Sequence, residues 1–255
     1  MSGPGQAAFA AKRSLERLAR PAGDFDASRY FRGDTGRLGF YNVGTGPIRA
    51  LARSIHAAHK DRWSIDDAMD FSEQLIVDRH LEAKGVAVEL MARYRRDFTP
   101  RLLPVWKRWL ADGHAANWAT TDAICGCLVG PLLVARPSLA ATMRSWARHR
   151  GLWVRRASAV ALVPSARHGV ALDVAYDVAR RLHADRNDLI QKAVGWLLRE
   201  AGKTDTARLQ RYLLEHGPGI PRTTVRYAIE RMTPRVRKTL LEKTRVGPTF
   251  RGANR

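Results

Sequence analysis

Apolar residues recur at helical spacing along nearly the whole chain, in segments separated by Pro, Gly, Asp or Asn. Clear examples are the stretches GPIRALARSIHAAHK, SIDDAMDFSEQLI, GVALDVAYDVARRLHA and NDLIQKAVGWLLREAG. No convincing series of alternating apolar and polar residues indicates a β-strand. The pattern therefore predicts an all-α protein.

The helical segments also repeat. Five similar stretches align when one reference residue is taken from each: Lys84, Thr120, Arg156, Lys192 and Arg226. Successive reference positions are 36, 36, 36 and 34 residues apart, and each stretch reads as the second helix of a helix–turn–helix unit. Two-helix repeats of this length stack into an α-solenoid, in which like-placed helices line one concave surface. The sequence therefore predicts a HEAT-like helical-repeat solenoid.

The repeats predict a single domain over residues 10–245. Residues 1–9 start with polar and small residues, and we expect them to form a flexible N-terminus. Residues 246–255 are basic and contain Gly and Pro, so we expect a flexible basic tail. The chain of 255 residues is long enough to bury a sizeable core.

The chain is strongly basic, with 44 Lys and Arg residues against 24 Asp and Glu and a net charge of +20. Such an excess suggests an anionic partner, most simply nucleic acid, or a membrane surface. Four of the five reference positions carry Lys or Arg, which either contact phosphates or pair with acids of the preceding repeat. The shortage of acids favours phosphate contact. The basic reference positions therefore predict a basic concave face that binds duplex DNA with little dependence on sequence.

The cysteines, the histidines and the apolar runs argue against a disulfide, a metal site and a membrane span. Cys125 and Cys127 lie two apart on one predicted helix, so they cannot form a disulfide without breaking it, and a reducing cytoplasm is the simplest location. Two cysteines and eight unclustered histidines indicate no metal site, and we expect no cofactor. The longest apolar run, residues 123–135, is interrupted by Pro131 and is too short to span a bilayer. We therefore expect no membrane partner.

Asp122 is the unusual residue of the repeat register. Two places past the reference position, the other four repeats carry Val or a small residue. An ionised carboxylate on an inward-facing helix costs free energy unless it is solvated or paired. The aromatic Trp118 lies four residues earlier, on the same helical face. Asp122 is thus either a partly exposed helix residue bonded to a neighbouring turn or a functional carboxylate inside a basic surface.

The tryptophans divide into two groups. Trp106, Trp109 and Trp146 read as core residues at helix–helix contacts. Trp118 and Trp196 differ, because each shares its helical face with a charge: Trp196 follows Lys192 by four residues and precedes Arg199 by three. If both helices face one groove, two indole rings flank one carboxylate.

At these residues the sequence resembles the AlkD family of HEAT-like DNA glycosylases. The resemblance covers roughly residues 25–235, and it rests on the order and spacing of four stretches: NWATTDAICGCLVGPLL, WVRRASAVAL, QKAVGWLLREAGK and TTVRYAIERM. The earlier stretch YFRGDTGRLGFYNVGTGPIRALAR is similar to the opening of the family, although GFYNVGTGPIR departs from the commoner wording. The NWATTD wording is closer to the branch associated with bulky-adduct resistance in antibiotic producers than to the methyl-purine branch.

Carried over residue by residue, the resemblance implies that Asp122 is the catalytic carboxylate and that Trp118 and Trp196 are the groove tryptophans. It places Arg156 and Arg199 near the lesion, and it matches Tyr30 to an aromatic that approaches the lesion. Lys84, Lys192 and Arg226 are the further DNA-binding candidates of the repeat register.

The implied activity is hydrolysis of the N-glycosidic bond of N3- or N7-alkylated purines in double-stranded DNA, without base flipping and with room for bulky adducts. We also expect a monomer without a metal or cofactor. The alternative is a HEAT-like scaffold that binds nucleic acid or protein without catalysis, because charge, repeats and length fit it equally well. Only Trp118, Asp122 and Trp196 favour the enzyme.

Overall fold

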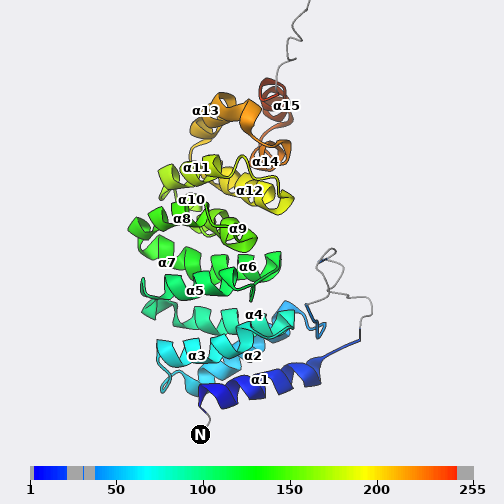
Figure 1. Ribbon diagram of the computed structural model, residues 1–255, viewed down its shortest axis with the longest axis vertical. Helices are drawn as coiled ribbons and strands as arrows, with labels where there is room; N and C mark the ends of the chain where they lie inside the picture. Colours follow the sequence, from blue (N-terminus) through cyan, green and yellow to red (C-terminus); the bar gives the residue numbers. More distant parts are fainter. Residues whose placement is uncertain (1–2, 22–30, 32–37, 246–255) are drawn as a thin grey trace, which may run out of the picture. The chain divides into compact units, whose positions relative to one another are not determined.

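The computed structural model describes residues 3–21, 31 and 38–245. These residues form α-helices joined by short turns and a few short helices of other types, and within them no β-strand forms. The predicted all-helical fold is confirmed (Figure 1). The α-helices are α1 (Pro4–Leu18), α2 (Thr45–His59), α3 (Ile65–Ile76), α4 (Leu81–Met91), α5 (Leu102–Ala111), α6 (Trp118–Ile124), α7 (Gly130–Ala135), α8 (Met143–Trp146), α9 (Leu152–Val160), α10 (Val163–Arg167), α11 (Leu172–Arg181), α12 (Asp188–Thr204), α13 (Thr206–His216), α14 (Arg222–Ala228) and α15 (Pro234–Lys243).

The chain divides into two compact units, Met1–Ala135 and Arg136–Arg255. In the first unit, α3 packs against α1 and α4, and α4 also contacts α2 and α6 (Figure 1). In the second unit, α12 is the central helix and contacts α9, α10, α11, α13 and α14. Layered helix pairs of this kind form a HEAT-like helical repeat.

The first helix corrects the expected N-terminal boundary. Residues 4–9, which the sequence analysis assigned to a flexible N-terminus, belong to α1. Pro4 stands in the first turn, where its missing N–H and fixed φ suit a helix start. Ala7 and Ala8 are buried, so the small apolar residues of this stretch pack against the rest of the unit. Burial of this helix face overrides the loose appearance of the opening sequence.

The repeat register places its reference residues on like-placed helices, as the spacing predicted. Each reference residue lies between the third and the fifth position of its helix. The helices and residues are α4 with Lys84, α6 with Thr120, α9 with Arg156, α12 with Lys192 and α14 with Arg226. The predicted repeat register is therefore correct, although the side chains at the five reference positions make different contacts.

Ion pairs between residues about one repeat apart link neighbouring helix pairs within each unit. Examples are Arg101–Asp66 at 2.7 Å, Arg144–Asp177 at 2.6 Å, Arg155–Asp185 at 2.7 Å, Arg167–Glu200 at 2.9 Å and Arg208–Asp173 at 2.6 Å. The exposed pairs among them, such as Arg101–Asp66, each contribute at most about 1 kcal/mol. They show that pairing with acids of an adjacent repeat does occur, but through arginines outside the reference column.

The helix that carries Asp122 does not stop at the end of α6. After α6, the residues Cys125–Val129 continue as a π-helix that leads directly into α7. Pro131 lacks an N–H and its ring crowds the carbonyl four residues earlier, and a widened turn accommodates both effects.

By length and composition alone, the whole helical stretch Trp118–Ala135 is apolar enough to cross a membrane. The sequence analysis had judged only residues 123–135 and found them too short; the helix starts five residues earlier. Half of the stretch is buried inside the structure. Core helices of soluble proteins pass the same test, so the observation is weak evidence for a membrane span.

The three tryptophans assigned to the core are buried, as predicted. Trp106, Trp109 and Trp146 are at most 2% exposed, and they are among the largest fully buried side chains of the described residues. Their burial removes large apolar surfaces from water, at about 25 cal/mol for each Å².

A close approach of α12 and α14 gives a stability prediction. A Cβ atom added at Gly195 would lie 2.4 Å from Tyr227 Cβ and 2.8 Å from the Thr224 carbonyl oxygen. We expect Gly195→Ala to lower the free energy of unfolding by about 1–3 kcal/mol, because backbone atoms must move apart. Gly46→Ala is the matched control, since nothing lies within 4 Å of its added Cβ. Equal midpoints of urea unfolding for both variants would contradict the prediction.

Candidate functional site

The start of α6 is fixed by a buried asparagine. Asn117 is the N-cap: its Oδ1 accepts a hydrogen bond from the Thr120 N–H at 2.8 Å, and its Nδ2 donates to Thr120 Oγ1 at 3.0 Å. One residue later in the helix, Thr121 Oγ1 donates to the Ala115 carbonyl at 2.9 Å. Asn117, Thr120 and Thr121 are all buried. The local sequence therefore holds the first turn of α6 rigidly against its preceding loop.

Trp118 and Asp122 stand on one face of this helix, four residues apart. The Trp118 side chain is among the few large hydrophobic ones left exposed, at 37%. Asp122 is partly buried. An exposed indole ring beside a carboxylate is not the arrangement of a core contact.

Phe31 is a site residue that the sequence analysis missed. Its ring stacks on Trp118, with ring centroids 5.5 Å apart and an interplanar angle of 18°, and it also contacts Phe40 at 5.5 Å. The predicted aromatic, Tyr30, lies outside the described residues. The sequence signal for Phe31 was its position next to the predicted Tyr30. The pattern of the sequence does not link this segment to α6, so the contact with Trp118 could not be predicted.

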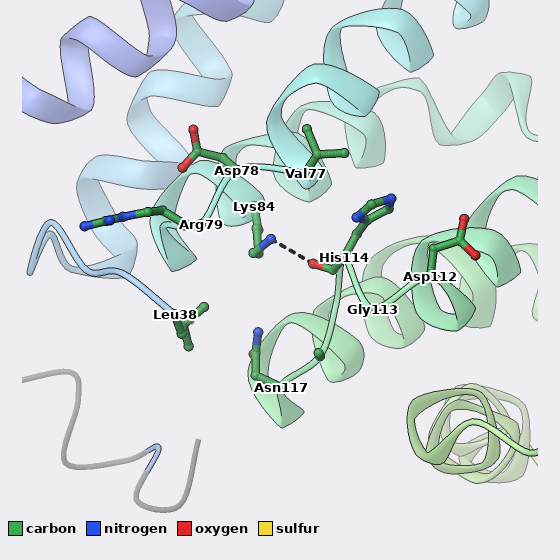
Figure 2. Close-up of a pocket in the computed structure, with 10 residues that line it drawn as sticks. Leu38, Val77, Asp78, Arg79, Lys84, Asp112, Gly113, His114 and Asn117 are labelled. Carbon is green, nitrogen blue, oxygen red and sulfur yellow. Dashed lines mark hydrogen bonds between the residues drawn. The ribbon is translucent and has the colours of Figure 1, made fainter. Parts of the chain in front are cut away.

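Lys84 lies near the N-terminal end of α6, and its side chain is bonded within the protein. Its ammonium group donates to the carbonyl of Ile76, the last residue of α3, at 2.7 Å. It also donates to the carbonyl of His114 at 2.8 Å, the bond drawn in Figure 2. The residue is only 6% exposed, and burial lowers its pKa to about 8. This placement argues against the predicted phosphate contact of Lys84. The lysine instead joins the end of α3 to the loop that leads into α6.

A cavity of about 450 Å³ adjoins Lys84 and Asn117, and Figure 2 shows their side chains entering it from two sides. Asp78 also lines it and bonds Lys12 at 2.9 Å and the His80 ring at 2.9 Å. Burial acts to raise the pKa of Asp78, but the hydrogen bonds from Lys12 and His80 outweigh it and lower the pKa to about 2. The wall of the cavity is therefore charged and fixed.

The second unit carries the other predicted site residues. Arg156 on α9 is only 7% exposed and donates to the Leu189 carbonyl, in the first turn of α12, at 2.5 Å. Lys192 on α12 pairs with Asp188 at 2.6 Å, and its side chain stays 41% exposed. The hydrogen bond to Asp188 is the largest cause that raises the pKa of Lys192, while the charge of Arg156 acts to lower it. Arg156 and Lys192 are thus electrostatic neighbours.

Trp196 and Arg199 follow Lys192 along α12, as the helical spacing predicted. Trp196 is partly buried. Arg199 bonds Glu230 and lies 3.5 Å from Glu200, so its guanidinium is already paired. Arg226 on α14 is exposed. Among the described residues, Trp118, Asp122 and Lys84 therefore belong to the first unit, and Arg156, Lys192, Trp196, Arg199 and Arg226 belong to the second.

No group of three metal-binding side chains occurs among the residues that the structure describes. The charged groups and aromatic rings of the site differ between the two units. In the first unit these are the Asp122 carboxylate and the indole of Trp118, and in the second they are mainly cations.

Comparisons with known proteins identify the family. The family model described as "DNA alkylation repair enzyme" matches residues 11–232. No curated protein matches the chain. A solved structure titled "Predicted DNA alkylation repair enzyme from Enterococcus faecalis" is similar, with a TM-score of 0.69 and 17% identity over 81% of this chain and 93% of that one. The family match spans most of the chain, and the solved structure shares its fold. The chain therefore belongs to the DNA alkylation repair enzyme family.

Proposed function

We propose that the chain is a DNA glycosylase that hydrolyses the N-glycosidic bond of cationic N3- or N7-alkylated purines in duplex DNA. The carrying observation is the exposed indole of Trp118 on the same helical face as the Asp122 carboxylate. A scaffold that only binds phosphates gains nothing from a carboxylate, which repels them.

An alkylated purine with a positive charge leaves readily, so the enzyme need not protonate it. Help is needed at the deoxyribose, where positive charge builds as the bonding electron pair departs with the base. A carboxylate beside the sugar stabilises this charge and orients or activates the water whose oxygen bonds to C1′. Opposite charges about 4 Å apart, at an effective dielectric near 20, interact by roughly 4 kcal/mol, which in the transition state alone is on the order of a thousandfold in rate.

In this proposal, Asp122 supplies the carboxylate and Trp118 supplies an electron-rich ring face. An indole face attracts a cation by about 0.5–2 kcal/mol. Stacking by Phe31 supports this role, because it holds the Trp118 ring in one orientation. The resemblance names Trp196 as a second groove tryptophan, and this assignment stays a prediction.

We further propose that the protein grips the backbone around the lesion and leaves the base stacked in the duplex. Phosphate contacts from exposed cations such as Lys192 and Arg226 suit this mode. A base that is never enclosed in a pocket can carry a bulky adduct, so the proposal extends to bulky N3 lesions.

The test is an assay of base release. We expect the protein to free the modified base from duplex oligonucleotides that carry N7-methylguanine, N3-methyladenine or a bulky N3 adduct, and to leave undamaged purines in place. We also expect the affinity for duplex DNA to fall steeply with salt. Tight, salt-dependent binding without release of any lesion would favour the non-catalytic scaffold.

A further inference from the structure

The last helix of the described residues, α15, lies beyond the family match. The family match stops at residue 232, and α15 begins at Pro234. Between residues 222 and 245 the sequence has eight Lys or Arg residues and two Glu, a net charge of +6 out of +20 for the whole chain. Fewer than a tenth of the residues therefore carry nearly a third of the net charge.

Most of these cations are exposed. Seven of the eight side chains are exposed, and the C-terminal basic surface is defined by them: Arg226, Arg231, Arg235, Arg237, Lys238, Lys243 and Arg245. Of the two acids, Glu230 already bonds Arg199. The two local carboxylates therefore leave this surface with a large net positive charge, which attracts a polyanion.

The helix is docked firmly. Arg222, the first residue of α14, donates to the Leu241 carbonyl at 3.0 Å and to Thr244 Oγ1 at 2.9 Å. Thr244 is buried, and a Cβ atom added at Gly217 would lie 2.8 Å from its side chain. The end of α15 is thus held against α14 and the preceding turn.

Like charges meet at this junction. Burial is the main cause that lowers the pKa of Arg222, and the charges of Arg245 and Arg226 lower it further. Arg222 therefore lies near Arg226, the last residue of the basic reference column, and near Arg245, two residues after the end of α15.

We propose that α15 and the C-terminal basic surface bind the phosphate backbone of duplex DNA away from the lesion and so lengthen the binding footprint. The inference rests on the proposed function. Arg235 and Lys238 lie one turn apart on the face of α15 opposite the buried Leu240, where they reach successive phosphates. The exposed side chains of α15 are charged, Thr or Pro, so the helix has no apolar face for a membrane.

The test compares two double variants of the full chain. Arg235→Ala with Lys238→Ala removes two charges from α15, and alanine at exposed helix positions preserves the helix. Arg180→Ala with Arg211→Ala removes two exposed charges from α11 and α13 and is the matched control. Affinity for undamaged duplexes of increasing length is measured as a function of salt concentration.

We expect the slope of log Kd against log salt to fall by up to about 1.8 in the α15 variant, at about 0.9 for each lost phosphate contact. Its affinity for long duplexes should fall about tenfold near 100 mM salt, while short duplexes bind almost unchanged. The control variant should keep the slope of the natural protein.

The inference is overturned if the α15 variant keeps its slope, or if both variants lose the same amount. Excision at saturating DNA separates this result from the proposed function. If the natural protein excises alkylated bases and the α15 variant keeps its salt slope, only the role of α15 is refuted. A natural protein with neither excision nor salt-dependent binding would refute both.

Discussion

Asp122→Asn is expected to reduce single-turnover excision of an alkylated purine by at least about a hundredfold, while binding to duplex DNA stays equal or becomes slightly tighter. The amide keeps nearly the shape of the carboxylate and removes its charge. The loss falls on the step in which charge builds on the sugar, because only that step needs the carboxylate. Binding does not suffer, since one repulsion with the phosphates disappears.

The measurement is release of N7-methylguanine or N3-methyladenine by an excess of folded protein. Asp61→Asn is the matched control, because that carboxylate is exposed outside the candidate site and should leave the rate unchanged. Full activity of Asp122→Asn would remove Asp122 from the mechanism. Joint loss of stability and DNA binding would assign it a structural role instead.

Lys84→Met is expected to change how the stability of the protein depends on pH. Burial lowers the pKa of Lys84 to about 8 in the folded state, whereas an unfolded lysine titrates at 10.5. Below pH 8 both states are protonated, and the folded state carries the full cost of the buried charge. Between pH 8 and 10.5 the unfolded state binds more protons, so this group makes the free energy of unfolding rise with pH.

We expect the natural protein to gain about 3 kcal/mol of stability over Lys84→Met between pH 8 and 10.5. Urea unfolding of both proteins at several pH values measures the difference. Tyrosines such as Tyr176, whose pKa burial raises to about 12, affect both proteins alike and cancel. Lys60→Met, at an exposed position, should run parallel to the natural protein. A parallel profile for Lys84→Met would refute the buried ammonium.

Helical periodicity and repeat spacing were enough to predict the architecture. Both depend on which residues are apolar and how far apart they lie, and these are local properties of the chain. The same logic assigned Trp106, Trp109 and Trp146 to the core correctly. It failed at residues 4–9, where a helix forms because its small apolar face is buried by a segment distant in sequence.

The basic column shows where periodicity stops being informative. Lys84, Arg156 and Arg226 occupy equivalent helix positions, yet the first two are buried and bonded to backbone carbonyls while Arg226 is exposed. A long side chain with several donors either reaches outward to a phosphate or folds back to a helix end. The choice depends on whether an unpaired carbonyl lies within reach, and that depends on packing.

The candidate site likewise combines features that helix spacing fixes with features that depend on tertiary packing. The sequence by itself determined that Trp118 and Asp122 share one face of a helix, because a spacing of four residues fixes this in any α-helix. Only the tertiary structure decided that Trp118 stays exposed, that Phe31 stacks on it, and that Lys84 ties α3 to the loop before α6. These contacts join segments roughly 30 to 90 residues apart, and no local pattern encodes them, because they form only when the helices pack.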